Sequence, residues 1–319
     1  SPKAEGLIYC GTDDGLIQIT QDGGKNWTKI EKVDGVPLNT YVGRLLASQH
    51  DANVVYALFD NHKNSDFAPY VFKSSDKGKT WTNISNNLPA NGPSLSIAED
   101  FVDPNLLFVG TEFGLFNSKD GGKTWTRMRA GLPTIPVRDI VIQKRENDLV
   151  VGTFGRGIYI LDDYSEMRQK PLDPKLDGEI SPVKPVITFI PASSGTGSQG
   201  ETVYHAPNPP SGAVINYRLK EAPKSLKQKR QEAEAQMTRN GEVVPFVTAE
   251  QLRAEAEEDP SALIVTISDK TGAPIRRITG ADGAGSHRVI WDLRGDSALN
   301  GGFPVMPGEY KAEVLRRVN

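Results

Sequence analysis

The sequence has few of the features that fix a function by themselves. It contains one cysteine, Cys10, so no internal disulfide can form. No apolar run approaches the ~18 residues that a membrane span needs. The formal net charge of −3 gives no electrostatic reason to expect a nucleic-acid partner. The four histidines lack metal-ligand spacing, and no nucleotide-binding glycine loop occurs. We therefore expect no metal, no cofactor, no nucleic acid and no membrane span.

Glycine and proline, in contrast, are plentiful. The chain of 319 residues contains 31 glycines and 22 prolines, which suits many tight turns between short strands. At roughly 100–200 residues per domain, this length predicts about two domains.

One turn pattern, Ser/Thr-x-Asp-x-Gly-x-Thr-Trp, occurs three times in the first half of the chain. The copies cover residues 20–27, 74–81 and 118–125, with Asn26 in the threonine place of the first. The aspartate can accept hydrogen bonds from backbone N–H groups of its own turn. The glycine supplies a backbone angle that a side chain would penalise, and the tryptophan supplies apolar surface. We predict a structural role for Asp22, Gly24, Trp27, Asp76, Gly78, Trp81, Asp120, Gly122 and Trp125.

Short strands surround these turns at a period typical of propeller blades. A period of about 40–50 residues with four short strands per repeat indicates a β-propeller. The repeat resembles the Asp-box (BNR) family, in which this turn joins the third and fourth strands of a blade. The pattern predicts two complete blades, over residues 40–84 and 94–128, flanked by partial blades over 7–29 and 137–161. Because an open propeller would expose its flanks, we expect further blades from an upstream segment or a separate chain.

The second half of the chain predicts a small β-sandwich. Residues 213–220, 263–268, 275–278, 286–292 and 309–315 alternate apolar and polar side chains, and a further strand is expected at 186–190. Residues 223–260 are highly charged and predict two surface helices, 224–239 and 249–258, the second opened by a capping box at Thr248. This insertion is either a solvated excursion or a docking arm.

The fold prediction is therefore all-β: a partial propeller of about 3.5 Asp-box blades (1–168), a linker (169–182) and an immunoglobulin-like sandwich with a helical insertion (183–319). Residues 206–220, 287–294 and 306–310 resemble bacterial exported proteins of the VPS10/sortilin type, which are often called BNR-repeat glycosyl hydrolases. In them, an Asp-box propeller precedes an immunoglobulin-like domain similar to that of flagellar hook-capping proteins. The resemblance implies export to the periplasm or the exterior.

In Asp-box propellers, the binding face is formed by loops between the second and third strands and by connections between blades. This implies a ligand-binding face that includes His62, Lys63, Asp66, Phe113, Arg138, Phe154 and Arg156, with Asn86 and Asn87 among the connections. A glycosidase needs two carboxylates about 5–9.5 Å apart, for which the candidates are Asp13, Asp14 and Glu112.

Two functions follow from these expectations. The first is an exported, non-catalytic propeller protein that binds a protein, peptide or glycan partner within a larger assembly. The second is a glycoside hydrolase whose site lies mostly on blades outside this sequence. Hydrolysis of polysaccharides would favour the second function, and recovery of a partner without hydrolysis would favour the first.

Overall fold

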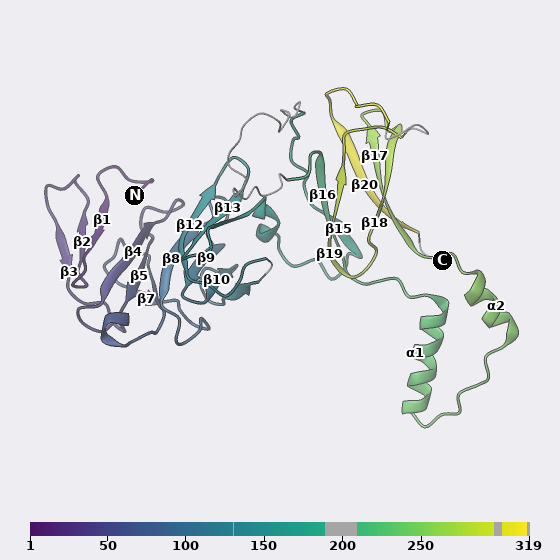
Figure 1. Ribbon diagram of the computed structural model, residues 1–319, viewed down its shortest axis with the longest axis horizontal. Coiled ribbons are helices and arrows are strands. Elements are labelled where there is room, and N and C mark those ends of the chain that lie inside the picture. Colours follow the sequence, from purple (N-terminus) through teal and green to yellow (C-terminus); the bar gives the residue numbers. More distant parts are fainter. Residues whose placement is uncertain (130, 189–208, 297–301, 318–319) are drawn as a thin grey trace. The chain divides into compact units, whose positions relative to one another are not determined.

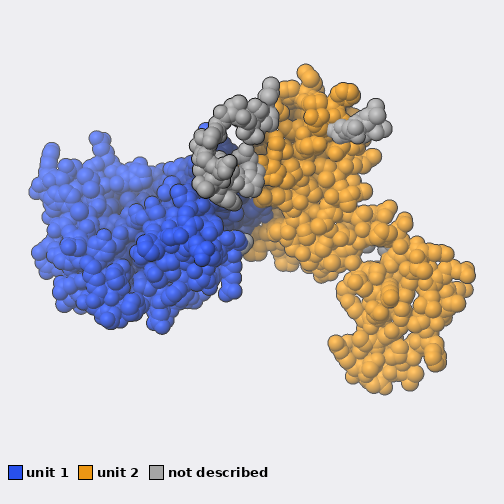
Figure 2. Space-filling view, viewed as in Figure 1, with its two compact units in different colours: residues 1–169 blue, residues 170–319 orange. Residues whose placement is uncertain are grey.

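The computed structural model describes residues 1–129, 131–188, 209–296 and 302–317. The chain divides into two compact units, unit 1 (Ser1–Gln169) and unit 2 (Lys170–Asn319), shown in blue and orange in Figure 2. Each unit has its own hydrophobic core, and each is described by itself below.

Unit 1 is a row of four antiparallel sheets, A to D (Figure 1). Sheet A contains β1 (Ile8–Gly11), β2 (Ile17–Thr20) and β3 (Thr28–Ile30). Sheet B contains β4 (Tyr41–Ala47), β5 (Val55–Asp60), β6 (Tyr70–Ser74) and β7 (Thr82–Asn83), and the 3₁₀ helix η1 (His62–Asn64) lies between β5 and β6. Sheet C contains β8 (Ser94–Glu99), β9 (Leu107–Thr111), β10 (Gly114–Ser118) and β11 (Thr126–Met128). Sheet D contains β12 (Val137–Gln143), β13 (Asp148–Thr153) and β14 (Ile158–Leu161).

Consecutive sheets pack face to face, because both faces of the middle sheets B and C carry apolar side chains. In β9, Phe108 packs toward sheet D and Val109 toward sheet B, and both are fully buried. The two middle sheets have four strands and the two end sheets have three, in the predicted order. The predicted all-β class with a partial propeller is therefore confirmed.

The first strands of sheets B, C and D share an irregularity. The register of each pair shifts at one residue: Gly43 in β4, Leu95 in β8 and Arg138 in β12. A β-bulge of this kind bends its strand and re-aims a side chain. All three bulges lie at the strand end that faces the loop between the second and third strands of the same sheet.

Sheet D ends differently from the other sheets. Where the turn pattern decays, a 3₁₀ helix, η2 (Tyr164–Arg168), follows β14. Tyr164 is buried against Phe108 of sheet C with ring centroids 5.3 Å apart. Its hydroxyl and the Arg168 guanidinium both bond to the carboxylate of Asp100, which is fully buried. Burial raises the pKa of Asp100, but the hydrogen bonds from Arg168 and Tyr164 outweigh it and hold that pKa below its usual range.

Unit 2 is a β-sandwich. One sheet has the order β15 (Gly178–Ile180), β16 (Ala213–Leu219), β19 (Gly285–Trp291), and the other has the order β18 (Pro274–Gly280), β17 (Ala262–Asp269), β20 (Tyr310–Arg317). The inward-facing residues of both sheets, among them Ile215, Val265 and Trp291, form one core.

The helical insertion forms as predicted, with α1 (Leu226–Arg239) and α2 (Ala249–Glu257). Each helix opens with a complete capping box, at Ser225 and at Thr248. Neither helix has a buried residue, and Phe246 between them is fully exposed.

Three expectations differ from the structure. Part of the stretch 169–182, expected to be a linker, is strand β15, because Glu179 and its neighbours continue the backbone hydrogen bonds of β16. Residues 186–188 are not in a strand, and the rest of that expected strand, 189–190, lies outside the described residues. Trp27 does not anchor its strand in a core: it is 46% exposed, because no sheet in the described part of unit 1 precedes sheet A.

Candidate functional site

The Asp-Gly turns of unit 1 are built from the same contacts three times. Asp22, Asp76 and Asp120 each accept from the backbone N–H four residues later, at 2.8–2.9 Å. For Asp22 and Asp76 this bond is the main cause of a pKa lowered to about 2. For Asp120, burial raises the pKa, but bonds from Thr124 and Ser118 outweigh it, again giving about 2. Their lone pairs are occupied within the turn, which is the chemistry of a structural residue rather than of a proton-transfer group.

Two asparagines expected on the binding face instead support the third turn. Asn86 Nδ2 donates to the Gly122 carbonyl at 2.7 Å, and Asn87 exchanges two bonds with the backbone of Trp125. Both asparagines follow β7 in sheet B, so they hold the turn of sheet C against its neighbour. Sequence position alone placed them on a connection between sheets, but their side chains bond to the turn.

The opposite edge of the four sheets carries the candidate binding surface, which we call the loop edge. It consists of the loops 12–16, 60–69, 111–114 and 153–157, together with the starts of β4, β8 and β12. The loops 60–69, 111–114 and 153–157 connect the second and third strands of sheets B, C and D, so they lie at the same edge of the row (Figure 1). The loop 12–16 connects β1 and β2 of sheet A, and it lies at this edge because the Val42 N–H at the start of β4 donates to the Thr12 carbonyl at 3.1 Å.

Exposed aromatic side chains gather at the loop edge. Tyr41 is 42% exposed, Phe67 49%, Phe113 41% and Phe154 68%. They come from sheets B, C and D, so they form a series across the row rather than a cluster in one loop. Surface aromatics of this kind are characteristic of contact sites, where they add large apolar area at low entropic cost.

Charged side chains lie between these aromatics. Arg138, the bulged residue of β12, stands over the Phe154 ring with its guanidinium carbon 5.5 Å from the centroid, and it lies 4.0 Å from Glu112. Arg44 of β4 forms an ion pair with Asp139 of β12, which spans from sheet B to sheet D. Arg127 donates to the Phe113 carbonyl at 2.8 Å. The loop edge is therefore a patterned surface with aromatic faces and arginines held at fixed positions.

The enlarged loop of sheet B is ordered by its own polar contacts. The Asp66 carboxylate accepts from Asn61 at 2.8 Å and from the Tyr70 hydroxyl at 2.6 Å. His62 bonds to Asp60 at 2.8 Å, and Lys63 is exposed. Asp66 is thus a positioning residue for the loop, whereas His62, Lys63 and Phe67 are available to a ligand.

The three candidate catalytic carboxylates come from the loops of two sheets that are not neighbours in the row. Asp13 and Asp14 are exposed in the turn of sheet A, and Asp14 accepts a hydrogen bond from Thr12. Glu112 is in the loop of sheet C, so sheet B lies between them. Arg156 is exposed at the loop edge of sheet D. The sequence does not predict the contact between Arg44 and Asp139, because no local pattern indicates a contact between sheets. Phe67 lies in the predicted loop of sheet B, and its exposure is the signal that adds it to the site.

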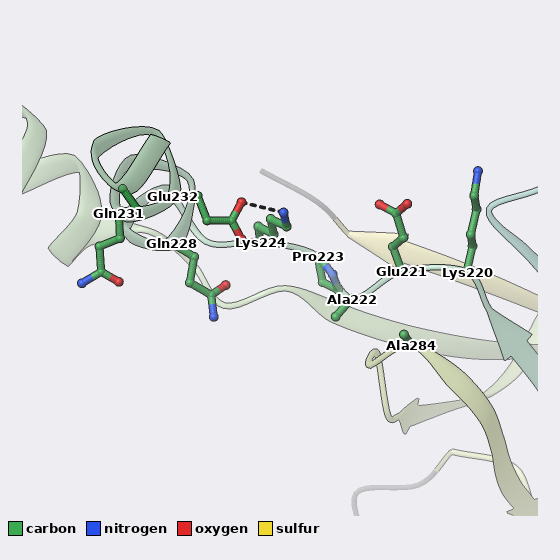
Figure 3. A pocket seen from close by; sticks show the side chains of 10 residues that line it. Lys220, Glu221, Ala222, Pro223, Lys224, Gln228, Gln231, Glu232 and Ala284 are labelled. Atoms are coloured by element: carbon green, nitrogen blue, oxygen red, sulfur yellow. Dashed lines mark hydrogen bonds and ion pairs between the residues drawn. The ribbon is translucent and has the colours of Figure 1, made fainter. Parts of the chain in front are cut away.

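Other features give weaker candidates. The hollow of about 700 Å³ in Figure 3 lies at the root of α1, and its Lys224 and Glu232 form an ion pair of 2.6 Å with each other. Its lining is charged and exposed, and lacks the apolar walls of a small-molecule site. Among the described residues, no group of three or more His, Cys, Asp or Glu side chains could hold a metal ion. In the same part of the chain, no helix is both long enough and apolar enough to span a bilayer.

Comparisons with known proteins give only distant similarities. No protein-family model and no curated protein matches the chain. Among solved structures, the chain is similar to the GH74 enzyme of Niastella koreensis, with 17% identity over 52% of this chain and 28% of that chain, at a TM-score of 0.42. It is also similar to YCF48 bound to D1 peptide, with 15% identity over 46% and 44% of the two chains (TM-score 0.34). YCF48 from Cyanidioschyzon merolae shows 16% identity over 58% and 62% (TM-score 0.37). The chain thus spans less than two thirds of each of these proteins, and the similarity is too low to transfer an activity.

Proposed function

We propose that this chain is an exported, non-catalytic propeller protein that binds a protein, peptide or glycan through its loop edge, within a larger assembly. The observation that carries the proposal is the series of four exposed aromatics, Tyr41, Phe67, Phe113 and Phe154, at one edge of the sheets. Exposed aromatic rings are costly in water, and a series of them at one edge is typical of a contact surface.

The framework beneath this surface favours binding without large rearrangement. Tyr41, Phe67 and Phe113 belong to sheets B and C, which pack on both faces, and Phe154 follows β13 of sheet D, which packs on sheet C. The Arg44–Asp139 ion pair joins the first strands of sheets B and D. A surface that is already ordered loses little conformational entropy when a ligand binds. The arginines supply donors for carboxylates, hydroxyls or backbone carbonyls, so the partner presents apolar or sugar faces with acceptor groups between them.

The order of the repeats and the sandwich along the chain supports a family assignment. The self-bonded Asp-Gly turns of unit 1 and the sandwich of unit 2 follow the order of the exported Asp-box proteins described above. We assign unit 2 to the immunoglobulin-like class on this resemblance, and export on the same ground.

A glycoside hydrolase is the second candidate function, and Glu112 is the observation that favours it. This carboxylate lies at the loop edge beside Arg138, whose guanidinium stacks on an exposed aromatic ring. Glycoside hydrolases use carboxylates that flank the bond they cleave.

One set of variants tests both functions. Binding of the purified chain to a glycan array and to a displayed peptide library is measured for wild type and for F113A/F154A. We expect the double variant to lose at least tenfold in affinity for every ligand found, while F246A, which removes an exposed aromatic of unit 2, does not change it. Equal binding by wild type and F113A/F154A would refute the loop-edge site. Hydrolysis of a polysaccharide panel that disappears in Glu112→Gln would instead establish the enzyme.

A further inference from the structure

The Asp-Gly turns of sheets B and C are pressed against the preceding sheet. A Cβ atom built on Gly78 would lie 2.5 Å from Cδ1 of Ile19 in sheet A, and one built on Gly122 would lie 2.8 Å from Cδ1 of Ile84 beside sheet B. These glycines therefore have two reasons to lack a side chain: their positive φ angles and the close approach of the neighbouring sheet.

The tryptophan of the turn makes the same inter-sheet contact. Trp125 is 4% exposed, and its Nε1 donates to the carbonyl of Ile84 at 2.7 Å. Trp81 packs onto the core cluster shared by sheets A and B. The turn thus acts as the part of each sheet that docks on the sheet before it.

The first turn has the same pattern without this neighbour. Within 4 Å of a Cβ built on Gly24, the described part of the chain places only atoms of its own Trp27 ring, at 3.8 Å. The Trp27 indole N–H donates within its own turn, to the Gly24 carbonyl, and the side chain is 46% exposed. The matched residue Trp125 is more than ten times less exposed.

The strand next to this turn shows the same contrast. Ile8 pairs with Thr20 as Leu107 pairs with Ser118, yet Ile8 is 46% exposed and Leu107 is fully buried. Cys10 occupies the place of the fully buried Val109, and it is exposed.

We infer that the surface formed by Ile8, Cys10, Gly24 and Trp27, here called the Trp27 face, is a docking site for one further four-stranded sheet of the same repeat. That sheet would place an aliphatic side chain over Gly24, as Ile84 does over Gly122, and a main-chain carbonyl within reach of Trp27 Nε1. The inference rests on the proposed membership in a larger assembly and specifies one contact of it.

The other end of the row supports this choice of occupant. The outer face of sheet D exposes Val141 (56%), Ile158 (71%) and Ile160 (59%). By strand pairing, Val141 and Ile158 occupy the places of Ala98 and Leu115, which sheet D buries in sheet C. Sheet D therefore exposes the positions that sheet C buries against its neighbour, just as sheet A exposes the positions that sheet C buries on its other face.

Site-specific photocrosslinking tests the occupant. Trp27→p-benzoylphenylalanine is introduced into the chain expressed in the cells that naturally produce it, and the products of irradiation are identified by peptide mass spectrometry. Phe246→p-benzoylphenylalanine, at a fully exposed position of unit 2, is the matched control. We expect position 27, but not position 246, to crosslink to a peptide outside residues 1–319 that belongs to a sheet with the same Asp-Gly-Trp turn.

Three results would overturn the inference: no crosslink at position 27, a crosslink to an unrelated protein, or a crosslink to residues 137–161 of a second copy, recognised by mixed isotope labelling. Alkylation of Cys10 in the unaltered protein decides the matter if the variant does not fold. We expect the isolated chain to react at least tenfold faster than the native assembly, and equal rates would exclude a covered face. The loop-edge binding assay is independent of both measurements, so the two proposals can fail separately.

Discussion

Removing the guanidinium of Arg168 should weaken the packing of η2 and sheet D against sheet C. The Asp100 carboxylate is fully buried, and Arg168 is 16% exposed with its Nη2 2.7 Å from Asp100. Breaking a buried ion pair by removing one partner costs about 3–5 kcal/mol, because a charge is left buried and unpaired. The Tyr164 hydroxyl and two backbone N–H groups still bond to Asp100 in Arg168→Ala, so we expect the lower end, about 3 kcal/mol.

Hydrogen exchange read by mass spectrometry measures this effect within unit 1. We expect the free energy of opening to fall for peptides covering β8–β9 and β12–β14, while peptides from β17 in unit 2 stay unchanged. Arg145→Ala is the control, because its ion pair with Glu146 is exposed and is worth about 0–1 kcal/mol.

The same cluster has a predictable pH dependence. The pKa of Asp100 in the folded protein is below its ordinary value, so its contribution to stability is complete above the unfolded pKa of about 3.9 and is lost as the pH falls through the folded pKa. The gap between wild type and Arg168→Ala should therefore narrow below about pH 4. An Arg168→Ala variant that costs no more than Arg145→Ala, or a gap that widens in acid, would refute the reasoning.

Three further predictions concern single residues. Gly122→Ala should destabilise unit 1 by about 2–4 kcal/mol in urea unfolding, because it adds a clash with Ile84 to the cost of positive φ, whereas Gly24→Ala should cost about 1–2 kcal/mol; equal costs would contradict the packing argument. The folded pKa of Asp120 is about 2, so wild type should lose the stability that this carboxylate contributes as the pH falls from about 4 to about 2. Asp120→Asn lacks this contribution, so its free energy of unfolding should change less with pH over that range. Thr248→Ala should increase amide exchange in α2 by an amount equivalent to about 0.5–2 kcal/mol, and unchanged exchange would show that the cap is not used.

The local structure of this protein could be predicted from the sequence because its signals are local. The Asp120 carboxylate accepts its hydrogen bonds from residues no more than four positions away, and the alternation in β17 and β19 needs only its own strand. The capping box at Thr248 is likewise complete within four residues.

What could not be predicted depends on neighbours distant in sequence. Trp27 and Trp125 have the same local sequence pattern, and only the presence or absence of a preceding sheet separates an exposed side chain from a buried one. Asp100 and Arg168 are 68 residues apart, and nothing in either segment indicates that the two side chains form a buried ion pair.

The candidate site divides in the same way. Phe113, Phe154 and Arg138 were placed on the binding face because they lie in or next to loops of known position in the repeat. Arg44 and Asp139 bond across sheets 95 residues apart, and that contact exists only after the row has assembled.

The bulges in β4, β8 and β12 lie between the exposed side chains of the loop edge and the buried side chains that hold the sheets together. At the three bulges the residues are Gly43, Leu95 and Arg138, which share no chemistry, while their neighbours Val42 and Val137 are buried. The extra residue of a bulge is left unpaired in the ladder, so strand pairing does not dictate its side chain. Substitutions at these three positions would therefore change the side chains that the loop edge presents, while the buried neighbours continue to hold the sheets together.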